Sequence, residues 1–217
     1  MEDNKSMNWK NFILRALASI LGITFISFGA ALSESMDMGL DPFTAMNRGA
    51  SALLGFSLGN YQLVVNLIIL AIVFFMKRSL IGWGTVFNMV LVGYQVDFFK
   101  SLFDNFFVVE EMSFIIRILI TIAAILVFTF GVAVYMDAEL GVSPYDAIAP
   151  LVVDRTGWKY TPVRIAQDLI IVVIALLVGG PVGISTFITG FFAGPLISFF
   201  SKKITKPTME KFQTSAQ

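Results

Sequence analysis

Long, nearly uninterrupted runs of hydrophobic residues are the main pattern along this chain of 217 residues. A helix needs about 20 mostly apolar residues to cross the hydrocarbon core of a bilayer, with about 17 as a lower limit. Six runs reach or approach this length: Phe12–Leu32, Tyr61–Met76, Leu80–Phe99, Phe114–Met136, Val163–Val178 and Ile184–Phe200. They lack the charged faces of helices in a water-soluble bundle. The pattern therefore predicts an all-α, polytopic membrane protein with about six transmembrane helices.

The composition agrees with a protein whose main solvent is lipid. Hydrophobic residues make up 57% of the chain and charged residues only 14%, whereas about a quarter of the residues in a typical soluble domain are charged. The polar N-terminus leads into the first run without a cleavage site of the Ala-x-Ala type. We expect Phe12–Leu32 to be a retained first helix and not a signal peptide.

The absence of two residue types limits the reactions and metal sites that this protein can support. The sequence contains no cysteine, which excludes disulfides and thiolate metal sites. It contains no histidine either, and histidine is the commonest general base and metal ligand. A nucleophile–base set and a phosphate-binding loop are also missing. The sequence thus predicts that the protein is not an enzyme and has no cofactor, no metal site and no nucleic-acid partner.

The chain repeats itself with a shift of about a hundred positions. Its coinciding pairs include Gly29 with Gly131, Gly39 with Gly141, Pro42 with Pro144, Gly55 with Gly157 and, one deletion later, Gly93 with Gly194. Apolar runs match easily by chance, but several glycines and a proline in one register do not. We expect two related membrane repeats, residues 12–105 and 113–202, which together form one membrane domain. An N-terminal segment (1–11) and a C-terminal tail (203–217) flank them.

Each repeat also contains a short segment that begins at a proline, Pro42–Leu54 in the first and Pro144–Val153 in the second. Both segments are too short to span a bilayer at about 1.5 Å per residue. They are therefore predicted to be re-entrant helices, each entering and leaving the membrane on one side. An interfacial helix that faces lipid is the alternative.

Basic residues provide an independent test, because they favour the cytoplasmic side of a membrane. The re-entrant arrangement puts the basic loops, among them Lys77-Arg78, in the cytoplasm together with both termini, and leaves the acidic loop around Glu110-Glu111 outside. Each repeat then has three spans, an odd number, so the two repeats must be inverted relative to each other, as in many secondary transporters. We expect a multi-pass protein of the bacterial inner membrane.

The short helices share one pattern at their start. Asp41-Pro42 and Ser143-Pro144 each combine a favoured N-cap residue with proline at the first helical position. Two such starts near the bilayer midplane would bring partial positive charges together, and transporters use paired half-helices in this way to hold anionic groups. The alternative is that Asp41 and Ser143 only cap their helices and bind no ligand. The predicted substrate-binding residues here are Asp41, Pro42, Phe43, Thr44, Ser143, Pro144, Tyr145 and Asp146.

The second span of each repeat carries a polar stripe. Gln62 and Asn66 in the first repeat match Arg164 and Asp168 in the second, and each pair is spaced i,i+4 on one helix face. An acid inside the membrane is a functional hypothesis by default, although Arg164 could also neutralise Asp168 as a structural ion pair. These four residues are further candidates. So is Arg48, which either binds an anion or extends to the interface.

Small and hydroxyl residues occur in the third spans, among them Asn88, Thr189 and Gly190. We expect them to pack against the short helices, since such residues allow close helix contacts, more than to line a pathway. Asp37 and Glu139, which precede the two prolines, are expected to be loop or interface residues.

At Gly39-Leu40-Asp41-Pro42-Phe43, Gly141-Val142-Ser143-Pro144-Tyr145-Asp146 and Gly84-Thr85, the sequence resembles the YitT/YczE/YyaS group of bacterial membrane proteins. The resemblance covers nearly all of the chain. It implies the membrane architecture and no particular substrate. The first copy departs from the group's Gly-x-x-Pro-aromatic-Asp element, with Thr44 at the aspartate position. YitT-type members carry a soluble C-terminal domain, so the resemblance favours the shorter YczE-like form.

Three functions remain open at this point. The first is a transporter of a small polar or anionic solute that binds between the two half-helix starts. The second is an accessory or regulatory membrane protein that acts through a partner. The third is a vitamin-binding subunit of an energy-coupling-factor transporter, which the duplication makes less attractive because such a subunit needs no inverted halves. The expected partners are the lipid bilayer and an unidentified solute, and the small size is compatible with a homodimer.

Overall fold

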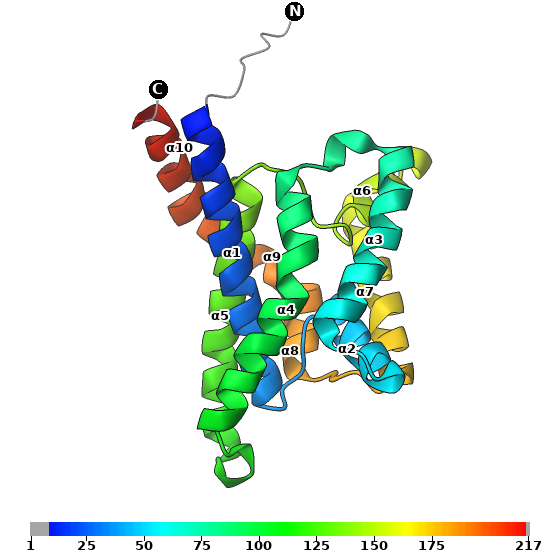
Figure 1. Ribbon diagram of the computed structural model, residues 1–217, viewed down its shortest axis with the longest axis vertical. Helices are drawn as coiled ribbons and strands as arrows, with labels where there is room; N and C mark the ends of the chain where they lie inside the picture. The colour runs from blue at the N-terminus through cyan, green and yellow to red at the C-terminus, as the bar shows by residue number, and fades with distance from the viewer. Residues whose placement is uncertain (1–8, 216–217) are drawn as a thin grey trace, which may run out of the picture.

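The computed structural model describes residues 9–215, and every regular element in this range is a helix (Figure 1). The longer helices are α1 (Trp9–Ser35), α2 (Pro42–Leu54), α3 (Leu58–Met76), α4 (Trp83–Phe106), α5 (Phe114–Asp137), α6 (Ile148–Thr156), α7 (Tyr160–Leu177), α9 (Ala193–Phe200) and α10 (Lys206–Ser215). A one-turn helix, α8 (Ile184–Phe187), precedes α9. A π-helical turn (Ile188–Phe192) joins α8 to α9, and a second one (Ser201–Thr205) joins α9 to α10, so that the three helices form one long helical stretch.

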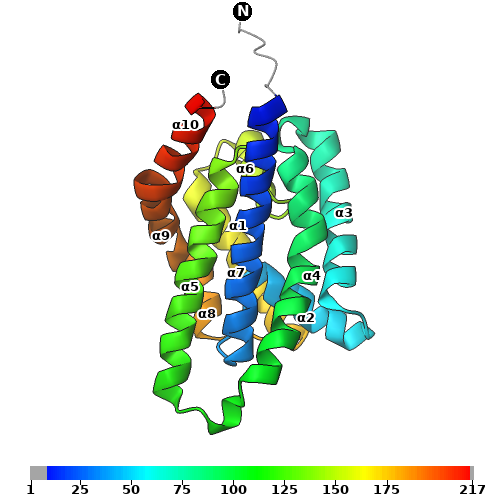
Figure 2. The same cartoon turned by 60° about the vertical axis from the view of Figure 1, so that its left-hand side comes forward.

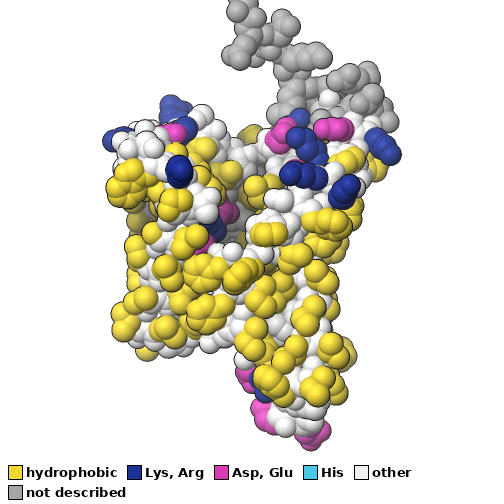
Figure 3. Space-filling view, turned by 180° about the vertical axis from the view of Figure 1, so that it is seen from behind, with side chains coloured by type: hydrophobic (Ala, Val, Ile, Leu, Met, Phe, Trp, Pro, Cys, Tyr) yellow, Lys and Arg dark blue, Asp and Glu magenta, His cyan; other side chains and the backbone are white. Residues whose placement is uncertain are grey.

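The surface of this helical assembly is that of a membrane protein. Five helical stretches are long and apolar enough to cross a bilayer: α1, α3, α5, α7 and Ile184–Phe212. Large apolar side chains point away from the protein, such as Phe75 at 87% exposure and Leu177 at 80%. In Figure 3 hydrophobic side chains cover the middle of the molecule, while charged side chains gather at its two ends and inside a hollow between them. The prediction of an all-α membrane protein is confirmed.

The long helices run up and down beside one another (Figures 1 and 2). Helix α1 leads away from the end that holds both described termini, and α3 returns to it. Helices α4 and α5 repeat this pair of passes, and α7 and the α8–α10 stretch repeat it again. The short helices lie near opposite ends of the assembly, α2 far from the termini and α6 close to them. Helix α4 is long but is not among the five most apolar stretches, and it carries Asp97, Lys100 and Asp104.

Glycines let α1 and α5 pack with their backbones in contact. A Cβ atom on Gly29 would lie 2.5 Å from the carbonyl oxygen of Ala124, and one on Gly131 would lie 2.6 Å from the backbone nitrogen of Ile26. Real Cβ atoms do not approach backbone atoms so closely, hence both positions need glycine. Gly29 and Gly131 are the pair that the internal repeat superimposes, so each repeat contributes the same contact.

The loops that lead to the two short helices also use matched contacts. Gly39 (φ 90°) and Gly141 (φ 106°) both adopt positive φ angles, where a side chain would be strained. The chain next to each glycine pairs with the other repeat: Gly84 N donates to Leu140 O at 2.8 Å, and Ser185 N donates to Met38 O at 2.8 Å. The loop before α2 is thereby tied to the start of α8, and the loop before α6 is tied to the start of α4.

The two short helices differ in where they begin. Helix α2 starts at Pro42, as the sequence predicts, but α6 starts at Ile148 and not at Pro144. Pro150 explains the difference, because a helix begun at Pro144 would hold Pro150 in its interior, where proline lacks a donor and clashes with the preceding turn. Starting at Ile148 leaves Pro150 in the first turn, where it is tolerated.

The structure describes only part of the two predicted terminal segments. Residues 1–8 of the predicted N-terminal segment lie outside the described residues. The predicted tail, 203–217, continues the last helical stretch as far as Ser215. The division into two repeats remains a prediction from the sequence.

Candidate functional site

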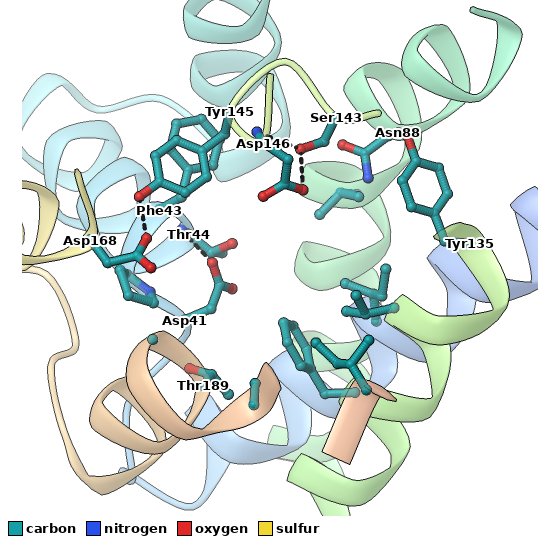
Figure 4. Close-up of a pocket in the computed structure, with 18 of the residues that line it drawn as sticks. Asp41, Phe43, Thr44, Asn88, Tyr135, Ser143, Tyr145, Asp146, Asp168 and Thr189 are labelled. Carbon is teal, nitrogen blue, oxygen red and sulfur yellow. Dashed lines mark hydrogen bonds between the residues drawn. The ribbon is translucent and has the colours of Figure 1, made fainter. Parts of the chain in front are cut away.

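A cavity of about 140 Å³ lies inside the assembly, between α2, α7 and the loop that precedes α6 on one side and α5 with the α8–α9 stretch on the other (Figure 4). Both sequence repeats contribute to its walls. Its polar and charged lining residues are Asp41, Thr44, Gln62, Asn66, Asn88, Tyr135, Ser143, Tyr145, Asp146, Arg164, Asp168 and Thr189. Its apolar lining residues include Pro42, Phe43, Phe128 and Gly190.

The loop before α2 brings a carboxylate to the cavity. Asp41 is the N-cap of α2, and its Oδ1 accepts a hydrogen bond from the backbone nitrogen of Thr44 at 3.1 Å. Pro42, Phe43 and Thr44 follow it and are buried. Asp41 forms no ion pair with a residue that the structure describes. The positive end of α2 is thus occupied by the chain's own acid.

The equivalent loop before α6 has a cap of its own. Ser143 Oγ accepts a hydrogen bond from the backbone nitrogen of Asp146 at 3.1 Å and donates one to Asp146 Oδ2 at 2.6 Å. Asp146 keeps 45% of its side chain exposed. This pair closes a turn just ahead of α6 and places a second carboxylate at the cavity, which remains open to its surroundings here.

Arg164 on α7 joins two carboxylates. Its Nη1 lies 2.6 Å from Asp146 Oδ1, and its Nε lies 3.0 Å from Asp168 Oδ2. The hydroxyl of Tyr145 donates to the other oxygen of Asp168 at 2.5 Å. Asp168 is only 1% exposed, so both of its oxygens have a donor although water hardly reaches it. The i,i+4 pair expected from the sequence is present, and it belongs to a larger network.

Other polar groups at the cavity have no partner. Gln62 and Asn66 on α3 are 3% and 1% exposed, and Tyr135 on α5 is 4% exposed. Gln62 Oε1, Asn66 Oδ1 and Nδ2, and the Tyr135 hydroxyl form no hydrogen bond with the residues that the structure describes. Buried polar groups in folded proteins are nearly always hydrogen-bonded, so a cluster of exceptions around one cavity needs an explanation.

Eleven of the predicted binding residues line this cavity, and two do not. Pro144 is not among the lining residues. Arg48 lies on α2 and forms a different ion-pair cluster, with its Nη2 at 2.9 Å from Glu34 Oε2 and its Nη1 at 2.6 Å from Asp97 Oδ1. It therefore ties α2 to α1 and α4, and it is not among the residues that line the cavity.

Sequence reasoning missed several lining residues. Tyr135 was not singled out, although a tyrosine near the end of a span needs a partner for its hydroxyl. Asn88, Thr189 and Gly190 line the cavity, and Gly190 also lies against Pro42 of α2, a contact of the kind that the sequence predicts. Their polarity within a span was the available signal. Asp37 and Glu139 lie in the loops that follow α1 and α5, as expected, and they pair with Arg117 and Arg15.

Within residues 9–215 there is no group of three or more acidic residues arranged to hold a metal ion. Two of the three acids at the cavity, Asp146 and Asp168, instead pair with the guanidinium of Arg164. The site can therefore bind a polar or charged molecule through hydrogen bonds and ion pairs.

Comparison with known proteins places the chain among bacterial membrane proteins. The family described as "Family of unknown function (DUF6198)" matches residues 13–202. The chain is 27% identical to the uncharacterized membrane protein YczE of Bacillus subtilis, covering 88% of this chain and 86% of YczE. It is 23% identical to the uncharacterized protein YyaS of the same organism, covering 88% and 94%. A Haemophilus influenzae protein is 23% identical, covering 89% and 84%. No solved structure matches the chain. The resemblance to the YczE-like group is confirmed.

Proposed function

We propose that this chain, which belongs to the DUF6198 family of unknown function, carries a small polar solute across the bacterial cell membrane. The solute binds in the cavity that both repeats line. The observation that carries this proposal is the network of Arg164, Asp146 and Asp168 beside unpartnered polar groups, deep among apolar helices. Ionisable side chains inside a membrane are costly and mark solute or ion pathways.

The contacts between the repeats support an inverted-repeat transporter. Arg15 of the first repeat pairs with Glu139 of the second at 3.2 Å, and Arg117 of the second pairs with Asp37 of the first at 3.2 Å. The same two positions of each repeat are used in both pairs, as a two-fold relation between the halves requires. Transporters built in this way bind solute where the repeats meet, and rocking of one half against the other exposes the site to each side in turn.

This proposal includes a topology. Six helical stretches cross the inner membrane, with α4 as the sixth, and α2 and α6 are re-entrant from opposite sides. Both termini lie in the cytoplasm together with the α3–α4 and α6–α7 loops. Lys77, directly after α3, forms an ion pair with Asp154 near the end of α6. The polar side chains of α4 are then accommodated by neighbours, as in the ion pair of Asp97 with Arg48 at 2.6 Å.

The test is uptake by purified protein in liposomes. Vesicles are incubated with a mixture of small polar metabolites, and their contents are identified by mass spectrometry. At least one solute should enter only when protein is present. Asp168→Asn should abolish its entry, because it removes the charge that Arg164 and Tyr145 hold. Asp154→Asn is the matched control, since it also breaks an ion pair but lies outside the cavity.

An accessory function is the other outcome of this test. If no solute enters the vesicles in a protein-dependent manner, while protein isolated from native membranes retains a stable partner, the transport proposal is wrong. The partner would then define the function.

A further inference from the structure

The side chains around the cavity carry more negative charge than positive charge. Among residues 9–215, three carboxylates line it, those of Asp41, Asp146 and Asp168, and Arg164 is the only lining residue with a positive charge. Arg164 already contacts two of the three acids. The N-terminus of α2, worth roughly half an elementary charge, is capped by Asp41. Even with both short-helix termini included, roughly one negative charge remains without a partner at the cavity.

The buried polar groups at the cavity that have no hydrogen-bond partner also bear on the kind of ligand. Gln62 Oε1 and Asn66 Oδ1 are hydrogen-bond acceptors, Asn66 Nδ2 is a donor, and the Tyr135 hydroxyl can donate or accept. All three side chains line the cavity and are at least nine-tenths buried. The two amide oxygens need a ligand that donates hydrogen bonds. An anion could accept from Asn66 Nδ2 and the Tyr135 hydroxyl, but it would leave Gln62 Oε1 and Asn66 Oδ1 without a donor.

The cavity also suits an organic ligand. Its volume of about 140 Å³ is close to that of an engineered cavity of about 150 Å³ that binds benzene. Aromatic rings of Phe43, Phe128, Tyr135 and Tyr145 are in its wall. In Figure 4 Asp41 and Asp168 lie on one side and Tyr135 lies on the other. Ring faces attract cations, and they do so more strongly when water is excluded.

From these observations we infer that the solute is a small organic cation, an ammonium compound of about the size of a benzene ring. This inference rests on the proposed transport function, because it names the solute class of the same cavity. The ammonium group binds Asp41, which has no ion pair of its own, and donates hydrogen bonds to the acceptors on α3. The carbon skeleton packs against the aromatic wall. The anionic solute expected from paired helix termini is disfavoured, since the acid at Asp41 already occupies such a terminus.

Three probes that differ in charge test this inference: n-butylammonium, 1-butanol and butyrate. Their binding to the purified full chain in detergent micelles is measured by isothermal titration calorimetry. We expect n-butylammonium to bind at least about tenfold more tightly than either of the others, a difference of about 1.4 kcal/mol. Asp41→Asn should weaken its binding by about the same factor. Asparagine is as good an N-cap as aspartate, so α2 keeps its start.

Asp37→Asn is the matched control. Asp37 lies in the same loop, has a positive φ of 54° that asparagine tolerates, and does not line the cavity. This variant should bind n-butylammonium like the unchanged protein. Binding of butyrate or 1-butanol as tight as that of n-butylammonium overturns the inference. So does the absence of n-butylammonium binding, or unchanged binding by Asp41→Asn.

Binding in micelles does not depend on transport, so the two proposals can fail separately. If n-butylammonium binds as expected but no solute enters liposomes, the transport function is wrong and the cation site stands. If a solute does enter liposomes and butyrate competes with it while n-butylammonium does not, transport stands and the cation inference is wrong.

Discussion

The rings of Phe43 and Tyr145 stack on each other, with 4.5 Å between their centroids and 15° between their planes. These two residues are equivalent in the sequence repeat, the first after Pro42 and the second after Pro144. Equivalent residues can contact each other only close to the axis that relates their repeats. Both rings also line the cavity. The proposed two-fold axis therefore runs beside the candidate binding site, which is where inverted-repeat transporters hold their solute.

The hydroxyl of Tyr145 is predicted to hold Asp168 in place. Tyr145→Phe keeps the ring stack on Phe43 and removes only the donor at 2.5 Å from Asp168. A hydrogen bond to a charged group contributes about 1.5–3 kcal/mol, and we expect the free energy of unfolding to fall by that amount. Denaturation in mixed micelles measures it. Tyr94→Phe, which removes an exposed hydrogen bond to Asn60, should cost less than about 0.5 kcal/mol. Equal losses would argue against a special role for the buried hydroxyl.

The Arg48 cluster is predicted to be structural. Arg48→Met leaves Glu34, with 6% of its side chain exposed, and Asp97 without their shared cation. Removal of one partner from a buried ion pair typically costs about 3–5 kcal/mol. The same measurement on Lys77→Met, which breaks the exposed pair with Asp154, should show a loss of at most about 1 kcal/mol. Adding Glu34→Gln to Arg48→Met should recover part of the loss. If Arg48→Met is as mild as Lys77→Met, the cluster does not stabilise the fold.

The matched glycines on α1 and α5 are predicted to be equally intolerant of a side chain. Gly29→Ala and Gly131→Ala should each lower the free energy of unfolding by about 1–3 kcal/mol, because backbone atoms of the facing helix cannot move aside. Gly194→Ala provides the control, since a Cβ atom there has no neighbour within 4 Å. It should be neutral or stabilising, as alanine favours helix. A loss at Gly194 as large as those at Gly29 and Gly131 would contradict this account.

The sequence predicts the parts of this site that depend on local rules. Asp41 caps α2 and Ser143 caps the turn before α6 because small polar side chains satisfy nearby backbone donors. Arg164 and Asp168 meet because i,i+4 residues share a helix face. The start of α6 is also determined locally, because Pro150 would lie in the interior of a helix that began at Pro144.

The parts that could not be predicted depend on distances between helices. Arg48 pairs with Glu34 and Asp97, which are distant in the sequence and belong to two other helices. Tyr135 and Thr189 reach the cavity because α5 and the α8–α9 stretch pack beside it. Spacing along one chain segment does not determine such contacts. The sequence therefore indicates that these residues are polar and lie within predicted spans, but it does not determine which residues they contact.

The most direct test of transport by two inverted halves uses the natural absence of cysteine from this chain. Single cysteines are placed at Ser79 in the α3–α4 loop, at Glu111 in the α4–α5 loop and at Thr189 in the cavity. Each variant is treated with a membrane-impermeant thiol reagent from either side of oriented vesicles. The account predicts that Ser79→Cys reacts only from the cytoplasmic side, Glu111→Cys only from the outside, and Thr189→Cys from both. Reaction of Thr189→Cys from one side alone, or of Ser79→Cys and Glu111→Cys from the same side, would contradict it.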